Sequence, residues 1–125
     1  MDKVAFVNSE LSFRVKDVNA SVKFYTGVLN FQKEYFSETP WEHAIIKRDD
    51  VIIHLNKVNV SEEITGWGCA FIKVRGIEEL WQNLKNDECM LSDLQLSDYY
   101  SETGLREFIL RDFDGNILRF CEVVE

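Results

Sequence analysis

The chain has 125 residues, of which 46% are hydrophobic and one is proline, a composition typical of a single globular domain spanning residues 1–125 rather than of a disordered segment. Its formal net charge of −8 argues against a nucleic-acid backbone as partner, since that partner requires a basic surface. We find no apolar run of the roughly eighteen residues that a membrane helix needs, and no basic and apolar leader typical of secretion. Three irregularly spaced cysteines favour reduced thiols and a cytoplasmic location.

The first half of the chain reads as a strand, a helix and further strands. Residues 10–16 alternate polar and apolar side chains, which predicts a half-buried strand. Asp17 is a residue type that caps helices, and the apolar residues after it recur at helical spacing up to Leu29. A weaker strand is predicted over residues 31–36. A hairpin follows, with strands near residues 42–48 and 51–58.

The second half begins after a polar link at residues 61–66 and repeats the same order of elements. Residues 69–75 predict a strand, and the apolar spacing from Ile77 to Leu84 predicts a helix. Residues 90–96 form a candidate strand, and a polar loop continues from residue 97 to residue 104.

The strongest local signal is a second hairpin around Asp114-Gly115, with apolar-rich runs on both sides. An Asp-Gly pair between such runs favours a tight turn, because glycine accepts the positive φ that the turn requires. A shift of 65 residues places the first hairpin on this one, with His54 on Arg119 and Glu42 on Glu107. A shift of 59 residues aligns the leading strands and helices of the two halves.

This internal repeat predicts an α+β fold built from two βαβββ modules, one over about residues 8–58 and the other over about residues 66–123. A single helix covers only one face of each sheet, so two such modules can bring their uncovered faces together around a cleft. Alternation along the strands then predicts which side chains lie on the uncovered faces. They are Glu10, Ser12, Arg14, Ile52, His54 and Asn56 in module one, and Cys69, Phe71, Lys73, Ile117, Arg119 and Cys121 in module two.

Two runs of this sequence are similar to those of a known superfamily. They are Phe13-Arg-Val-Lys-Asp-Val, continuing through Phe24-Tyr25 to Leu29-Asn30-Phe31, and the run from Arg106 to Phe120. In this order the chain resembles the glyoxalase, bleomycin-resistance and extradiol-dioxygenase (vicinal oxygen chelate) superfamily, whose unit is a paired βαβββ module. Around residues 47–55 and 106–116 it is most similar to bleomycin-resistance proteins. That resemblance implies a cytoplasmic homodimer that sequesters a cationic glycopeptide in clefts at the subunit interface.

The resemblance also implies where a metal would lie. Enzymes of the superfamily hold a divalent ion on four cleft residues, and the corresponding positions here are Glu10, His54, Cys69 and Arg119. The first three carry possible metal donors, whereas a guanidinium is permanently protonated and has no lone pair to offer. We therefore expect no metal and no other cofactor.

The same residues allow three interpretations, which the sequence leaves open. Glu10, His54 and Arg119 could form a metal site with a general base, an ion pair between Glu10 and Arg119 across the cleft, or polar lining of a wet pocket. Cys69 and Cys121 would act together only if they lie close to each other. His43 has no evident partner and is interpreted as structural.

Several aromatic residues are further candidates for ligand binding. Trp41 and Trp67 stand at predicted strand starts, and Tyr99 and Tyr100 lie in the long polar loop. Exposed rings at a cleft stack on flat or cationic ligands, although aromatic residues are also enriched at dimer interfaces. The predicted ligand-binding set is Glu10, Trp41, His54, Trp67, Cys69, Phe71, Tyr99, Tyr100 and Arg119.

The sequence is compatible with three functions. The first is a small-molecule-binding protein of the bleomycin-resistance type, which sequesters a cationic or aromatic ligand without catalysis. The second is a divalent-metal-dependent lyase, isomerase or dioxygenase. The third is a structural or regulatory module with no small ligand. The acidic charge and the guanidinium at position 119 favour the first, with no catalytic residue assigned, and we expect a homodimer that binds neither nucleic acid nor membrane.

Overall fold

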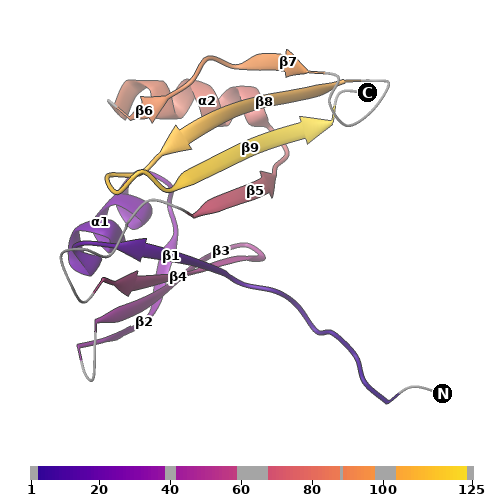
Figure 1. The fold of residues 1–125 in the computed structure, drawn as a ribbon. Coiled ribbons are helices and arrows are strands. Elements are labelled where there is room, and N and C mark those ends of the chain that lie inside the picture. The colour runs from indigo at the N-terminus through magenta and orange to yellow at the C-terminus, as the bar shows by residue number, and fades with distance from the viewer. Residues whose placement is uncertain (1–2, 39–41, 59–67, 88, 98–103, 124–125) are drawn as a thin grey trace.

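The computed structural model describes residues 3–38, 42–58, 68–87, 89–97 and 104–123. It contains two β-sheets, each formed by one half of the chain and each with its own helix (Figure 1). The α+β class and the two predicted modules are thereby confirmed. None of the described helices is long and apolar enough to cross a membrane.

Module one forms the lower sheet in Figure 1, with strand order β1-β4-β3-β2. Strand β1 pairs parallel with β4, and the remaining pairs are antiparallel. The helix packs against β2, β3 and β4. The elements are β1 (Leu11–Val15), α1 (Val18–Gly27), β2 (Gln32–Ser37), β3 (His43–Arg48) and β4 (Val51–Lys57).

Module two repeats this arrangement, with strand order β5-β9-β8-β6 and a further strand, β7, that also pairs with β8. Its helix contacts β8 and β9. The elements are β5 (Cys69–Lys73), α2 (Ile77–Leu84), a short 3-10 helix (Lys85–Asp87), β6 (Met90–Leu91), β7 (Gln95–Ser97), β8 (Leu105–Arg111) and β9 (Ile117–Val123).

The strand register confirms the internal repeat. In module one Ser12 lies opposite His54, and in module two Phe71 lies opposite Arg119. These two pairs are related by the shifts of 59 and 65 residues that the sequence predicts. His54 and Arg119 therefore occupy equivalent positions, near the middle of the last strand of each module.

The helices begin where the sequence provides acceptors for their first N–H groups. The Asp17 carboxylate accepts a 3.0 Å hydrogen bond from the Ala20 amide, which is the predicted cap of α1. Helix α2 begins after Gly76, which has a φ of +80°, and the Glu122 carboxylate from β9 accepts the amides of Gly76 and Ile77 at 3.2 and 3.0 Å. The second cap comes from a distant strand, so the local sequence does not reveal it.

The β8–β9 turn joins the two modules. Asp112 is 2% exposed, and its carboxylate accepts hydrogen bonds from the Tyr25 hydroxyl at 2.8 Å and from the Asn116 amide at 2.8 Å. Asn116 in turn donates to the Arg14 carbonyl and accepts from the Gly68 amide. These contacts fix β1 and α1 of module one against module two, and one apolar core runs through both modules.

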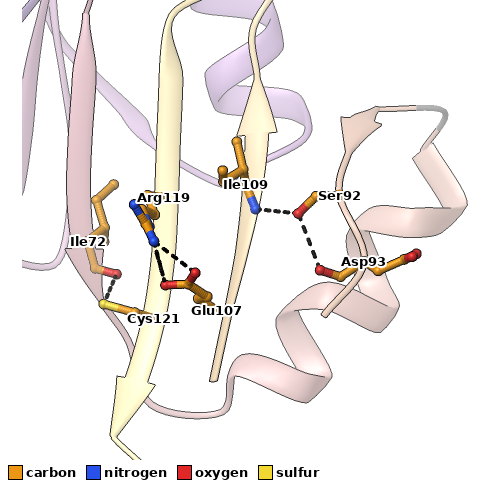
Figure 2. Close-up of polar contacts among 7 residues, drawn as sticks. All are labelled: Ile72, Ser92, Asp93, Glu107, Ile109, Arg119 and Cys121. Atoms are coloured by element: carbon orange, nitrogen blue, oxygen red, sulfur yellow. Dashed lines mark hydrogen bonds and ion pairs between the residues drawn. The ribbon is translucent and has the colours of Figure 1, made fainter. Parts of the chain in front are cut away.

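Two details of module two differ from the sequence prediction. The tight turn at Asp114-Gly115 is wider than predicted, because Asp112 and Asn116 still pair and three residues lie between them. The candidate strand over residues 90–96 is divided into β6 and β7. The division occurs at Ser92, whose hydroxyl accepts the Ile109 amide of β8 at 2.8 Å and so interrupts the regular pairing (Figure 2).

Candidate functional site

The uncovered faces of the two sheets carry the predicted polar residues. Ser12 and Arg14 on β1, and Cys69, Phe71 and Lys73 on β5, are exposed, whereas the residues between them are buried. This alternation agrees with the predicted faces.

A hydrogen-bonded chain of three side chains crosses the uncovered face of module one. Oε1 of Glu10 lies 2.6 Å from Nε2 of His54, and Nδ1 of His54 lies 3.0 Å from Nε2 of His43. The hydrogen bond from His54 holds the pKa of the Glu10 carboxyl below its usual range. The pKa of His43 is also lowered, by burial first and by the neighbouring His54 second.

The register explains why His43 and His54 meet. His54 lies opposite Ile45, and His43 is two residues before Ile45 on the same strand and the same face. Diagonal neighbours at this offset are within reach of long side chains. The interpretation of His43 as a residue without a partner is therefore wrong. The hairpin around the two-residue turn at Asp49-Asp50 was the signal that could have revealed the contact.

An ion pair occupies the corresponding place in module two. The Arg119 guanidinium donates to both oxygens of Glu107, at 2.8 Å to Oε1 and 3.0 Å to Oε2 (Figure 2). Its Cζ also lies 5.2 Å from the centre of the Phe71 ring, within the range of a cation–π contact. The side chains of both pairs, His43–His54 and Arg119–Glu107, are partly exposed, so a ligand can reach them on the uncovered faces.

Of the three interpretations that the sequence leaves open, the ion pair between Glu10 and Arg119 does not form in the described part of the chain. Glu10 contacts His54 and Asn8, whereas Arg119 is paired with Glu107 on the neighbouring strand. The sequence alignment placed Glu107 on Glu42, one residue away from its true counterpart, and so concealed this partner. The one-residue error arises from the wider β8–β9 turn.

The two cysteines of the uncovered face are not a pair. Cys69 lies opposite Ile117 at one end of β5, and Cys121 lies opposite Lys73 at the other end. Four residues of extended strand separate these levels by about 13 Å. Cys69 is exposed, Cys121 is buried, and burial raises the pKa of the Cys121 thiol.

An exposed aromatic ring borders the polar pair in each module. Phe71 is 39% exposed beside Arg119, and Tyr35 is 49% exposed with its ring centre 5.8 Å from that of His43. Tyr35 was not among the predicted site residues. Of the predicted aromatic residues, Trp41, Trp67, Tyr99 and Tyr100 lie outside the described part of the chain.

A separate hollow of about 1180 Å³ opens between the modules. Its floor includes the core residues Phe31, Ile72 and Phe120, and its rim includes Arg48, Arg75 and Glu79. The predicted site residues Glu10, His54, Cys69, Phe71 and Arg119 do not line it. Of the residues predicted on the uncovered face of module two, Lys73 and Cys121 do line the hollow, so it borders this face at the end of β5 away from Cys69.

The donor set at the four superfamily metal positions does not fit a divalent ion. Glu10, His54 and Cys69 carry possible donors, but Arg119 brings a fixed positive charge that is already bound to Glu107. Within the described ranges, no three His, Cys, Asp or Glu side chains converge as a metal-binding group.

Comparison with known proteins agrees with this fold. The model of the Glyoxalase/Bleomycin resistance protein/Dioxygenase superfamily matches residues 7–120. The bleomycin-binding protein from bleomycin-producing Streptomyces verticillus, solved with copper(II)-bleomycin, has a TM-score of 0.76 and 21% identity over 94% of this chain and 96% of that chain. TioX from Micromonospora sp. ML1 has a TM-score of 0.73 and 15% identity over 94% of this chain and 100% of that chain.

A superfamily member from Sphaerobacter thermophilus is similar to the same degree, with a TM-score of 0.75 and 17% identity over 93% of this chain and 98% of that chain. No curated protein matches the sequence significantly. At these identities the solved structures establish a shared fold and no shared activity. Because the superfamily model matches nearly the whole chain, this protein belongs to the glyoxalase, bleomycin-resistance and dioxygenase superfamily.

Proposed function

We propose that the protein is a small-molecule-binding protein of the bleomycin-resistance type, which sequesters a cationic or aromatic ligand without catalysis. The observation that carries this proposal is the composition of the uncovered faces. Each has an exposed ring beside a polar pair, Phe71 with Arg119–Glu107 and Tyr35 with His43–His54. Exposed rings beside polar side chains of this kind suit flat or cationic ligands.

Three further observations support this proposal. Arg119 places a permanent cation at one of the four positions that superfamily enzymes use for their metal. The solved bleomycin-binding protein of Streptomyces verticillus shares the fold over nearly its whole length. The formal charge of −8 favours attraction of a cationic ligand.

Thermal denaturation with metal-free bleomycin and with smaller cationic aromatic compounds tests the proposal. A ligand that binds only the native state raises Tm, and a cationic ligand loses affinity as salt increases. Phe71→Ala should weaken binding, whereas Met90→Ala, at a 55% exposed position on β6, should not. A chain whose Tm is unchanged by every compound in the panel would favour a structural or regulatory module.

We also propose that the functional unit is a homodimer and that the N-terminal arm, residues 3–8, contributes to it. Strand β1 pairs with β4 from Leu11 opposite Ile53, and β4 begins at Val51, so the chain before residue 9 extends past the end of its neighbour. Figure 1 shows this arm leading away from both sheets. Phe6 is 97% exposed and Val7 is 91% exposed. A second copy of the chain is the partner that would cover them, by reciprocal exchange of arms.

Sedimentation at tens of micromolar tests the dimer. The double substitution Phe6→Asp and Val7→Asp should convert a dimer into a folded monomer, because it places charge on the surface to be buried. Met90→Asp is the matched control and should leave the mass unchanged. A parent protein that sediments as a monomer would contradict the proposal.

The three free thiols support a cytoplasmic location for this unit.

A further inference from the structure

When both imidazoles are neutral, the contacts of the Glu10–His54–His43 chain fix the direction of its hydrogen bonds. An ionised carboxylate only accepts hydrogen bonds, so the 2.6 Å contact requires a proton on Nε2 of His54. A neutral imidazole carries one N–H, which leaves Nδ1 of His54 as an acceptor. The 3.0 Å contact to His43 then requires a proton on Nε2 of His43.

The far end of the chain is consequently an acceptor. With Nε2 of His43 protonated and the ring neutral, Nδ1 of His43 carries a lone pair. Among the described residues this atom has no hydrogen-bond partner, and no buried side-chain nitrogen or oxygen is left unsatisfied, so Nδ1 is accessible to solvent. The carboxylate at the other end polarises both rings and strengthens this acceptor.

The surroundings of His43 suit a flat donor. The Tyr35 ring lies 5.8 Å from the His43 ring and is tilted by 56° to it, and half of the tyrosine surface is exposed. The planes of the His43 and His54 rings differ by 10°, so the two imidazoles are nearly parallel, and the tilted Tyr35 ring lies beside them on the uncovered face. A flat ligand on the exposed part of Tyr35 would lie next to the His43 ring.

From this geometry we propose that His43 is a ligand-binding residue whose Nδ1 accepts a hydrogen bond from a planar, cationic N–H donor such as an amidinium, with Tyr35 against its face. Glu10 and His54 are positioning residues that fix the tautomer of His43. This inference rests on the proposed function, and it names the chemical group of the ligand that module one recognises.

Nitrogen NMR of the labelled protein at pH 8 tests the direction of the chain without any ligand. His43 and His54 should both carry their proton on Nε2. Glu10→Lys should reverse the chain, because an ammonium can only donate to Nε2 of His54, and both rings should then carry their proton on Nδ1. Ser9→Lys adds a positive charge beside position 10 and should leave both tautomers unchanged. A parent His43 protonated on Nδ1 would overturn the inference.

Binding of benzamidine, compared with benzoate and acetophenone, tests the ligand class. Benzamidine should bind the parent, and His43→Phe, which keeps a flat ring and removes the acceptor, should weaken it about tenfold or more. Glu10→Lys should favour benzoate instead. If bleomycin binds but benzamidine affinity is equal in the parent and in His43→Phe, the inference fails while the proposed function stands. If benzamidine does not bind the parent but another compound of the panel does, the inference alone fails; if no compound of the panel binds, the proposed function fails as well.

Discussion

His43 of module one and Glu107 of module two occupy equivalent positions in the repeat. His43 lies opposite Asn56 on the last strand of its module and Glu107 lies opposite Cys121, two residues beyond His54 and Arg119 respectively. Each contacts that central residue diagonally, at 3.0 Å in module one and 2.8 Å in module two. The same backbone site thus carries a hydrogen-bonded pair of imidazoles in one module and a carboxylate–guanidinium ion pair in the other.

Removal of the Asp112 carboxylate should strongly destabilise the protein. Asp112→Ala deprives the buried Tyr25 hydroxyl and the amides of Asp114 and Asn116 of their acceptor, and each buried donor left without a partner costs free energy. We expect the free energy of unfolding in urea to fall by about 3 kcal/mol. Asp50→Ala, in the exposed turn of module one, should change it by less than about 0.5 kcal/mol. Equal effects would show that the turn does not hold the modules together.

Gly68 should tolerate no side chain. A Cβ at this position would lie 2.3 Å from Cδ1 of Phe13 and 2.7 Å from Oδ1 of Asn116, both in the joint between the modules. Gly68→Ala should therefore lower the free energy of unfolding by about 1–3 kcal/mol. Gly27→Ala is the matched control, because nothing lies within 4 Å of its Cβ and alanine is favoured in a helix. Its thermal denaturation should occur at the same or a slightly higher temperature.

Asp114 should make stability depend on pH in the opposite sense to most carboxylates. Burial, the largest cause, raises the pKa of Asp114, although the hydrogen bond from the Lys16 amide opposes this. A carboxyl whose folded-state pKa is raised stabilises the fold below its unfolded pKa, and this stabilisation is lost as pH rises through the folded value. Asp114→Asn keeps an acceptor for Lys16 without the charge. Relative to the parent it should gain stability between acidic and neutral pH, as measured by urea unfolding at several pH values.

Much of the fold follows from the local sequence, because its signals and the tertiary structure agree. Asp17 caps α1 as predicted, and Asn30, with a φ of +57°, follows the helix end where the sequence suggests a stop. The predicted hairpins form, since alternating apolar residues have one core to face. The equivalence of His54 and Arg119 likewise required only the two sequence offsets.

The details that the sequence did not reveal depend on contacts between distant segments. The wider β8–β9 turn is held by Tyr25 of α1 and by Phe113, whose ring lies 5.1 Å from that of Phe24. The interruption between β6 and β7 depends on the bond from Ile109 to Ser92. At the site, the one-residue difference between the turns shifted the alignment enough to hide the Glu107–Arg119 pair.

The last prediction concerns Arg119 and metal binding. In the parent, the guanidinium neutralises Glu107 through two short hydrogen bonds and would repel a divalent ion from this face. Arg119→Glu removes that repulsion and leaves two carboxylates side by side, with the Cys69 thiol on the same face of the neighbouring strand. Carboxylate and thiolate groups are donors for zinc, and a bound ion would relieve the repulsion between the two acids.

We therefore expect Arg119→Glu to create zinc or nickel affinity that the parent lacks, measured by calorimetry and by metal analysis after purification without chelators. Arg119→Gln removes the cation without adding an anionic donor and should bind more weakly than Arg119→Glu by at least about tenfold. Arg111→Glu, at an exposed position further along β8, adds the same charge away from Glu107 and should gain no affinity. A parent that already retains one metal ion per chain, with no change in Arg119→Glu, would mean that a metal site forms despite the guanidinium, and would favour the metal-dependent enzyme over the binding protein.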